Sequence, residues 1–441
     1  MIGGSILKRG KRVLVAIGCV ALLLISWLIA ISAKSDEEKQ RELMGKAQSL
    51  MMDAIYVRAV PLLEEAAGYS TKHSYAVESE LKKAYLALFN THGYRSKYVG
   101  LLETQLGRND TPPEVFAEAA EYYISIRRVA EALKILADGI ERTDCEELME
   151  LYESNRYVYE TNRTSYDYIS AIHGGAAQVQ KDGLWGMANG RGDLMIPCIY
   201  EQISTFSADR AIVSNGVEIF AVDANNNRVA KLHENASSFG LGFAENRFPL
   251  RHDGGWSRTT GEFEIGAAAF EALGMYSNGY TAAKTGGKWG VIDLASSWLV
   301  PAEYDEIICD ELGRSFAQGA VFARLGDTVY LLKDGKETGE YFEDARPFSD
   351  EGYAAVKKNG KWGFIDTDGT IKIDFMFDDA LSFGQHLAAV KIGDYWGYAG
   401  RDGRIAIEAA FLIAKSFSNG SAPVLTERGW NFITLIEYRR N

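Results

Sequence analysis

The longest uninterrupted run of apolar and uncharged residues lies near the N-terminus, over residues 13–33. Its 21 residues, at about 1.5 Å of helical rise each, suffice to cross the roughly 30 Å hydrocarbon core of a membrane. The run follows four basic residues, Lys8, Arg9, Lys11 and Arg12, which favour a cytoplasmic N-terminus. We therefore predict a cytoplasmic tail at 1–12, a single-pass transmembrane anchor at 13–33, and a cell-membrane protein whose bulk is extracytoplasmic.

A cleaved signal peptide is the alternative interpretation of the same run. Small residues at Ala30, Ser32 and Ala33 suit a cleavage site. The apolar region of a signal peptide is usually only about 7–15 residues long, so an uncleaved signal anchor is the preferred interpretation.

From residue 34 to 158, apolar residues recur at the spacing of amphipathic helices, as in Leu81, Ala84, Tyr85 and Leu88. We expect six short helices that pack as antiparallel neighbours in a short α-solenoid. Residues 56–66 resemble half of a tetratricopeptide (TPR) repeat, although the full signature of about 34 residues is not met. A TPR-like segment suits either a peptide-binding groove or a spacer that holds the following domain away from the membrane.

After a polar, tyrosine-rich stretch at 159–170, predicted to be a linker, the pattern changes to glycine-punctuated strands with a fixed period. Trp362, Trp396 and Trp430 are each 34 residues apart. Aromatic residues fill the same slot upstream: Trp185, Phe220, Trp256, Trp289 and Tyr330, with Phe220 and Tyr330 marking degenerate units. A second landmark precedes each slot by 13 to 17 positions: Ile172, Phe206, Phe239, Tyr276, Phe316, Phe348, Phe383 and Phe417. Two marks with one period predict an all-β domain of eight repeats over 171–441.

Each repeat is expected to hold three strands. In the copy at 348–378, Asn359-Gly360 and Asp368-Gly369 are turn signals between alternating segments. Three strands cannot bury both of their faces alone, so neighbouring units must stack through the Trp and Phe landmarks. In the Trp-Gly units the glycine leaves room for an approaching ring or backbone. A closed propeller-like ring is preferred to an open β-solenoid, because rings tolerate about 4–8 blades.

The same copy contains Gly360-Lys361-Trp362-Gly363, then Ile365-Asp366, and ends in Phe377-Asp378. In this pattern the units resemble the bacterial WG-repeat (KWG) family over about 60% of the chain. The resemblance implies an exported or surface-attached repeat array, and it brings no catalytic assignment. The positions that carry it are structural repeat positions: Trp185, Gly186, Trp256, Trp289, Gly290, Trp362, Gly363, Trp396, Gly397 and Trp430.

Charge and composition limit the partners and the kinds of site that the chain can have. With 47 basic and 60 acidic residues the net charge is −13, which argues against nucleic acid as a partner. The four Cys are far apart without a CxxC, and the six His show no i, i+4 pair, so we assign no metal ligands, no cofactor and no catalytic residues. Carboxylates recur from unit to unit (Asp293, Asp305, Glu343, Asp366, Asp378), and we expect them to cap turns rather than form a glycosidase pair.

These observations favour a non-enzymatic binding or scaffolding platform on the bacterial cell surface, with an envelope protein or peptide as its partner. Two alternatives stay open: a protein that binds or cleaves cell-envelope glycan, and a transmembrane sensor component.

Overall fold

The computed structural model describes residues 36–260 and 262–436. The chain divides into two compact units, residues 1–151 and residues 152–441. The predicted tail at 1–12 and anchor at 13–33 lie outside the described residues. Among the helices that are described, none is long and apolar enough to cross a membrane.

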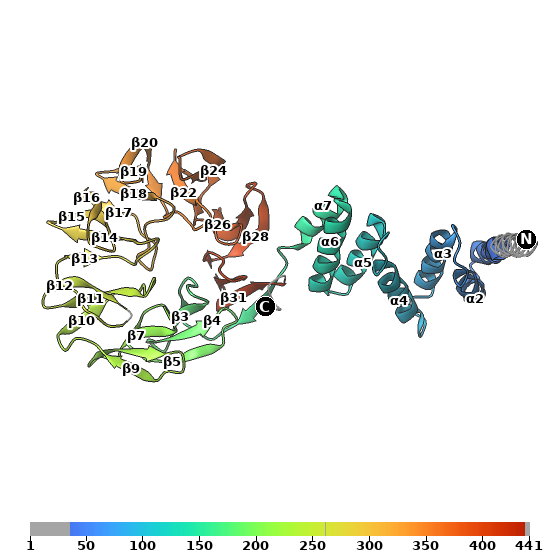
Figure 1. Cartoon of the computed structure of the whole chain (residues 1–441), viewed down its shortest axis with the longest axis horizontal. Coiled ribbons are helices and arrows are strands. Elements are labelled where there is room, and N and C mark those ends of the chain that lie inside the picture. Colours follow the sequence, from blue (N-terminus) through green and yellow to red (C-terminus); the bar gives the residue numbers. More distant parts are fainter. Residues whose placement is uncertain (1–35, 261, 437–441) are drawn as a thin grey trace, which may run out of the picture. The chain divides into compact units, whose positions relative to one another are not determined.

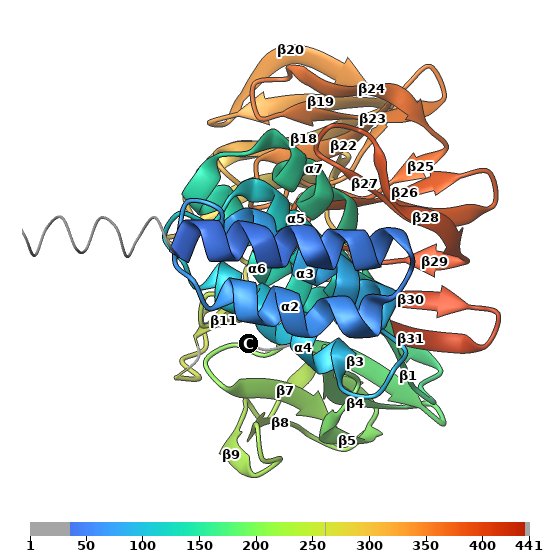
Figure 2. The ribbon, with the colours of Figure 1, turned by 90° about the vertical axis from the view of Figure 1, so that its right-hand side faces the viewer.

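The first unit is helical, as the apolar spacing predicted. A helix over residues 36–52 precedes α2 (Tyr56–Ala67), α3 (Ser74–Ala87), α4 (Tyr94–Leu106), α5 (Pro113–Ser125), α6 (Val129–Thr143) and α7 (Glu146–Asn155). The described residues thus hold seven helices, against six expected. The helix over 36–52 lies beside α2 (Figure 2), and Ala47, Ala59 and Leu63 share one apolar core. Sequential neighbours therefore bury each other's apolar stripes.

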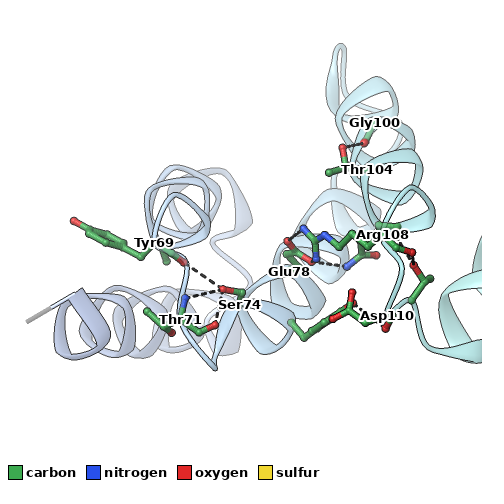
Figure 3. A network of polar contacts seen from close by, with 12 residues as sticks. Tyr69, Thr71, Ser74, Glu78, Gly100, Thr104, Arg108 and Asp110 are labelled. Atoms are coloured by element: carbon green, nitrogen blue, oxygen red, sulfur yellow. Dashed lines mark hydrogen bonds and ion pairs between the residues drawn. The ribbon is translucent and has the colours of Figure 1, made fainter. Parts of the chain in front are cut away.

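A buried carboxylate ties the end of α4 to α3 (Figure 3). Glu78 of α3 accepts hydrogen bonds from both terminal nitrogens of Arg108, at 2.6 and 2.9 Å, and from the Gln105 amide at 2.8 Å. Glu78 is only 6% exposed, and an unpaired charge at that depth would be costly. These hydrogen bonds stabilise the packing of α4 against α3.

The second unit is a ring of eight antiparallel sheets (Figure 1), which we number blades 1 to 8 in chain order. Blade 1 holds β2 (Tyr168–Ile169), β3 (Ala176–Lys181), β4 (Leu184–Asn189) and β5 (Leu194–Tyr200). Blade 2 holds β6 (Gln202–Ile203), β7 (Arg210–Ser214), β8 (Ile219–Asp223) and β9 (Arg228–Lys231). Blade 3 holds β10 (Ala236–Phe239), β11 (Arg247–His252) and β12 (Gly255–Thr260). Blade 4 holds β13 (Ala272–Leu273), β14 (Tyr280–Thr285), β15 (Lys288–Asp293) and β16 (Trp298–Tyr304).

The second half of the ring follows the same plan. Blade 5 holds β17 (Glu306–Ile307), β18 (Ala320–Leu325), β19 (Thr328–Lys333) and β20 (Lys336–Phe342). Blade 6 holds β21 (Asp344–Ala345), β22 (Tyr353–Lys358), β23 (Lys361–Asp366) and β24 (Ile371–Phe377). Blade 7 holds β25 (Asp379–Ala380), β26 (Leu387–Ile392), β27 (Tyr395–Gly400) and β28 (Ile405–Phe411). Blade 8 joins β29 (Ile413–Ala414), β30 (Ser421–Thr426) and β31 (Gly429–Leu435) to β1 (Tyr159–Arg163). The ring is therefore an eight-bladed propeller, the architecture preferred from the repeat count.

The expectation of three strands per repeat is wrong for seven of the eight blades, which have four. The additional strand comes first in each repeat and is two residues long, as in β25, where Ala380 pairs with Val390. Two residues cannot display a period of two, so the sequence pattern gives no sign of this strand. Blade 3 alone has three strands in the described structure, and residues 265 and 270 reach β12 only through isolated bridges.

The stretch at 159–170, expected to be a linker, is part of the ring. Its first residues form β1, which pairs with β31 from Tyr159 opposite Leu435 to Arg163 opposite Asn431, and it also contains β2 of blade 1. The sequence of β1 is polar and has no apolar alternation. It forms a strand because it pairs with the free edge of β31. The first strand of the unit thus completes the last blade and closes the ring.

Apolar residues fill the interfaces between successive blades, as the stacking argument required. At the interface of blades 6 and 7, Trp362 is 3% exposed and shares a core with Phe383, the landmark of the next repeat. Between blades 5 and 6 the rings of Phe322 and Phe348 stack with centroids 5.0 Å apart. At the closing interface Trp430 of blade 8 meets Tyr168 of blade 1 at 5.3 Å. The aromatic landmarks are therefore inter-blade core.

Candidate binding site in the central cavity

The six predicted tryptophans occupy one equivalent position in their blades. Each is the second residue of its strand: Trp185 in β4, Trp256 in β12, Trp289 in β15, Trp362 in β23, Trp396 in β27 and Trp430 in β31. Each belongs to a different blade, and Trp185 and Trp430 both contact the Tyr168 ring at the interface of blades 1 and 8.

The assignments of Phe220 and Tyr330 to the tryptophan slot are wrong by one residue. Trp362 lies opposite Lys357, and Gly363 lies opposite Val356. The residues in the register of Trp362 are Ile219, opposite Ser214, and Val329, opposite Arg324. Phe220 and Tyr330 therefore stand where regular blades have glycine.

The glycine that follows Trp185, Trp289, Trp362 and Trp396 is required by a close backbone approach. A Cβ atom on Gly363 would lie 2.7 Å from the carbonyl oxygen of Ile373 in the next strand, and one on Gly290 would lie 2.3 Å from that of Val300. The ladder shifts register at this point, between Trp362 and Phe364. In blade 5, where Tyr330 replaces glycine, that residue pairs directly with Tyr341. Glycine thus permits the bulge that brings the fourth strand across the third.

One of the second landmarks is also corrected. Phe239 ends β10, and the residue that precedes the recurring tight bridge in blade 3 is Phe243, because Ala244 bridges Arg247 just as Ser277 bridges Tyr280 in blade 4. Phe243 is fully buried and packs on Phe248.

The recurring carboxylates cap turns, as predicted. Asp366 accepts backbone hydrogen bonds from Asp368 and Thr370 at 3.0 and 2.9 Å, and Asp293 does the same with Ala295 and Ser297. The acids that follow an aromatic residue join two blades. Asp378 accepts from Lys361 of blade 6 at 2.5 Å and from the Gly393 amide of blade 7 at 2.7 Å.

A cavity of about 730 Å³ lies at the centre of the ring. Its walls are the segments that follow the first strand of blades 1, 5, 6, 7 and 8, and a residue of blade 4. Representative lining residues are His173, Arg314, Ser349, Gln385 and Asn419. A second cavity of about 490 Å³ lies towards blades 1 and 3 and shares Glu311 and Leu312 with the first. The volume of the first cavity falls within the range of about 300–1,000 Å³ typical of ligand pockets.

One inserted segment shapes both cavities. Phe316 follows β17 by nine residues, whereas Phe348 follows β21 by three. The extra residues form a turn in which the Asp310 amide donates to the Arg314 carbonyl at 2.9 Å and the Gly313 amide donates to the Asp310 carbonyl at 3.0 Å. We call residues 309–314 the channel loop. The Met275 amide of blade 4 donates to the Gly313 carbonyl at 2.8 Å, which holds the loop over the centre.

Glu311 of the channel loop contacts blades far around the ring. It accepts hydrogen bonds from Lys415 of blade 8, from the Ala171 amide of blade 1, and from the Tyr168 hydroxyl at 3.1 Å. Burial lowers the pKa of Lys415, but the contacts with Glu311 and Tyr168 outweigh it and the net shift is upward. The lysine is therefore charged at neutral pH and holds the loop in place.

Further charges at the cavity wall are paired. Arg346 donates to Asp379 at 3.2 Å and lies over the Trp362 ring at 4.6 Å. Glu351 accepts from Arg401 at 2.6 Å. Burial raises the pKa of Glu351, and the His386 amide and Arg401 more than compensate, so that its net shift is downward. Two buried atoms of lining residues, Ser349 Oγ and Arg346 Nε, have no hydrogen-bond partner.

The cavity was not predicted from the sequence. The channel loop is visible only as the unusual distance between Ile307 and Phe316, and the loops of the other blades contribute short, dissimilar segments. An insertion between the landmarks of one repeat was the signal that could have identified it.

Several solved structures match the chain at low identity and low TM-score. They include Hsv2 of Kluyvelomyces marxianus (8% identity, 58% of this chain, 92% of that chain, TM-score 0.36) and a eukaryotic initiation factor (10%, 64%, 89%, 0.38). PorZ, a surface component of the type-IX secretion system of Porphyromonas gingivalis, matches with 13% identity over 60% of this chain and 42% of its own, at a TM-score of 0.36. No curated protein matches the sequence.

A family model for the WG containing repeat matches residues 165–185, 185–216, 255–289, 289–327, 341–362 and 362–396. The unmatched stretches of the propeller include 217–254 in blades 2 and 3, 328–340 in blade 5, and 397–441 in blades 7 and 8. Phe220 and Tyr330, which replace glycine, lie in the first two. Over the matched residues, the propeller of this chain is similar to the WG containing repeat.

Proposed function

We propose that this protein is a membrane-anchored, extracytoplasmic binding platform whose propeller receives a segment of an envelope protein or peptide in the central cavity. The observation that carries the proposal is the contrast between scaffold and loops. Trp362, Gly363 and Asp378 recur with their contacts from blade to blade, whereas the segments lining the cavity differ in length and side chains. Variable loops on a rigid scaffold are where binding specificity resides.

A peptide suits the chemistry of the cavity wall. The lining combines apolar residues such as Leu381 and Phe417 with four acids and three basic residues: Asp310, Glu311, Asp350, Glu351, Arg314, Arg346 and Lys415. An extended peptide offers both apolar side chains and alternating backbone donors and acceptors.

The proposed role is non-enzymatic. The carboxylates that a hydrolase would need are engaged elsewhere, since Asp366 caps a turn and Asp378 bridges two blades. At the cavity, Glu311 is held by Lys415, and Glu351 by Arg401. The repeated acids Asp366 and Asp378 thus have structural roles, and Glu311 and Glu351 fix the loops that line the cavity.

Site-specific photocrosslinking in intact cells tests the proposal. A benzophenone amino acid at Asp350, whose side chain is 78% exposed at the cavity, should crosslink to one envelope protein upon irradiation. The matched control carries the same group at Glu408, which is exposed on the outer strand β28 and should give no such adduct. Equal adducts at both positions, or adducts with wall glycan alone, would contradict the proposal; the second result would favour a glycan-binding module.

The location is tested separately. Protease added to intact cells should remove the propeller while a cytoplasmic marker stays intact, and the chain should remain in the membrane fraction after high-salt washing. Protection of the propeller under conditions that digest a known surface protein would refute the proposed topology.

A further inference from the structure

Three side chains outside the central cavity meet on blade 3. His233 lies in the segment between β9 and β10, His252 ends β11, and Asp253 begins the turn into β12. One ligand atom from each lies within 4.8 Å of the others. His252 Nδ1 is 3.0 Å from Asp253 Oδ2, and His233 Nε2 is 4.0 Å from the same oxygen. The histidines are 19 positions apart, so no sequence spacing indicates the group.

The surroundings of His252 fix which of its nitrogens carries hydrogen. Nε2 lies 3.2 Å from the Gly266 carbonyl oxygen, which can only accept, and 2.9 Å from Ser257 Oγ. The Ser257 hydroxyl donates its one hydrogen to the Leu250 carbonyl at 3.2 Å, so it also accepts from His252. Nε2 is therefore the N–H of the neutral ring.

This tautomer leaves the lone pair of His252 Nδ1 facing a carboxylate. A lone pair and a carboxylate oxygen 3.0 Å apart repel unless a cation lies between them or a proton joins them. The imidazole is 6% exposed, and its orientation is fixed by its Nε2 partners.

From this geometry we propose that His233, His252 and Asp253 bind a divalent transition-metal ion, with zinc as the best match. Two imidazole nitrogens and one carboxylate oxygen are zinc ligands, and they suit calcium or magnesium poorly. Donors at about 2.0–2.2 Å from a tetrahedral zinc lie about 3.3 Å apart. Atoms now 3.0 and 4.0 Å apart need only small shifts to reach that separation.

Supporting hydrogen bonds also fit a metal centre. The Asn235 amide donates to Asp253 Oδ1 at 2.9 Å, which orients the carboxylate and leaves Oδ2 for the metal. Ser257 and Gly266 orient His252 in the way that outer partners orient metal-binding histidines. His233 accepts from the Asn235 backbone amide through Nδ1 at 3.2 Å, and this weak contact gives way when Nε2 binds the ion. His233 is 32% and Asp253 is 52% exposed in the side chain, so both can move.

The bound ion would fasten the segment before β10 to the β11–β12 turn. Blade 3 has the fewest strands of the blades in the described structure and reaches residues 265–270 through isolated bridges only. A metal crosslink at this point would reinforce the β10–β11 pairing, where Ala236 lies opposite His252. Its role is structural, and it is independent of any ligand in the central cavity.

Metal binding by the full-length protein in detergent tests the proposal. After chelator treatment and dialysis, competition with a chromophoric zinc chelator should reveal one tight Zn²⁺ site per chain, and Co²⁺ should give the intense visible absorption of a tetrahedral site. His233→Ala and Asp253→Asn should each weaken Zn²⁺ binding at least about 10-fold and bleach the Co²⁺ spectrum. His386→Ala, which removes an exposed histidine from blade 7, should change neither.

Thermal unfolding gives a second measurement. At free Zn²⁺ about 100-fold above the dissociation constant, the melting temperature of the tryptophan-rich propeller should rise by about 4 °C, and His233→Ala should abolish the rise. The His233 side chain is partly exposed, so this variant keeps the fold, which its unchanged melting temperature without metal should show. Absence of a tight site in the wild type, or equal affinity in His233→Ala, would overturn the proposal.

Discussion

Glu311 of blade 5 and Lys415 of blade 8 form an ion pair across the central cavity. Their blades are three places apart in the ring, so this contact joins elements that the blade-to-blade packing does not bring together. The side chains of Lys415 and Glu311 are 15% and 30% exposed. The pair therefore holds the channel loop at the centre and sets the shape of both cavities.

Glu311→Gln should destabilise the propeller by about 1–3 kcal/mol, because it leaves a largely buried ammonium without its counter-charge. Tryptophan fluorescence during urea unfolding measures the effect. The control is Glu218→Gln, which breaks the exposed pair with Arg228 on blade 2 (41% and 37% exposed) and should cost less than about 1 kcal/mol. Equal losses in the two variants would show that the Glu311–Lys415 pair is an ordinary surface contact.

Gly363→Ala should cost about 2–3 kcal/mol, because a Cβ would lie 2.7 Å from the Ile373 carbonyl oxygen and backbone cannot yield as a side-chain end can. The same unfolding assay applies. Asn431→Ala is the control, since Asn431 occupies that register in blade 8, where Arg163 pairs with it directly. Its loss should be limited to side-chain hydrogen bonds, about 1 kcal/mol. A Gly363→Ala protein as stable as the wild type would refute the steric explanation of the Trp-Gly step.

The ring architecture could be predicted because the packing between blades repeats in the sequence. Trp362, Trp396 and Trp430 occupy equivalent positions in successive blades. The interfaces that they fill each need a large aromatic side chain at that position, and this produces the 34-residue period. The period locates units but does not fix single positions where a unit is irregular. Phe220 and Tyr330 looked like tryptophan substitutes because both are aromatic, and only the pairing shows that they replace glycine.

Features that depend on long-range partners could not be predicted. The polar residues of β1 become a strand because Leu435 and its neighbours offer an open edge. Phe239 and Phe243 are both phenylalanines 13 to 17 positions before Trp256, so spacing alone does not distinguish them. His233 and His252 meet only after blade 3 folds, and the central cavity is formed by loops from several blades. The local sequence pattern therefore predicts the scaffold but not the candidate site.

A propeller fragment that begins at Ser165, and so lacks β1, should be much less stable than one that begins at Tyr152. Without β1, the residues from Asn431 to Leu435 lose their outer partner and β31 becomes an exposed edge, which promotes association between chains. We expect a melting temperature lower by at least about 5 °C and concentration-dependent light scattering. Identical melting and scattering of the two fragments would show that packing between blades 1 and 8 closes the ring unaided.

Cys309 should resist alkylation in the folded protein. It lies in the wall of the central cavity, and burial raises the pKa of its thiol to about 12, so at pH 8 almost none of it is the reactive thiolate. Mass spectrometry after a brief iodoacetamide pulse should find Cys309 unmodified in native protein and modified in urea. Glu311→Gln, which releases the channel loop, should increase labelling in the native state, whereas Glu218→Gln should not. Rapid native labelling of wild-type Cys309 would contradict the closed position of the loop.

The acids that bridge blades should make the propeller sensitive to low pH. The pKa of Asp378 is lowered by Lys361 and by the Gly393 amide, and that of Asp305 by Lys288 and by the Gly326 amide. A carboxyl whose pKa falls on folding contributes stability above its unfolded pKa of about 3.9, and this contribution is lost as pH drops through the lower folded value. Asp305→Asn/Asp378→Asn should therefore be less stable than the wild type at pH 7, and the difference should shrink as pH falls from about 4 towards 2. Urea unfolding at pH 7, 4 and 2.5 measures that difference. A gap that stays constant with pH would show that these carboxylates act through hydrogen bonds that their amide replacements cannot make, rather than through charge.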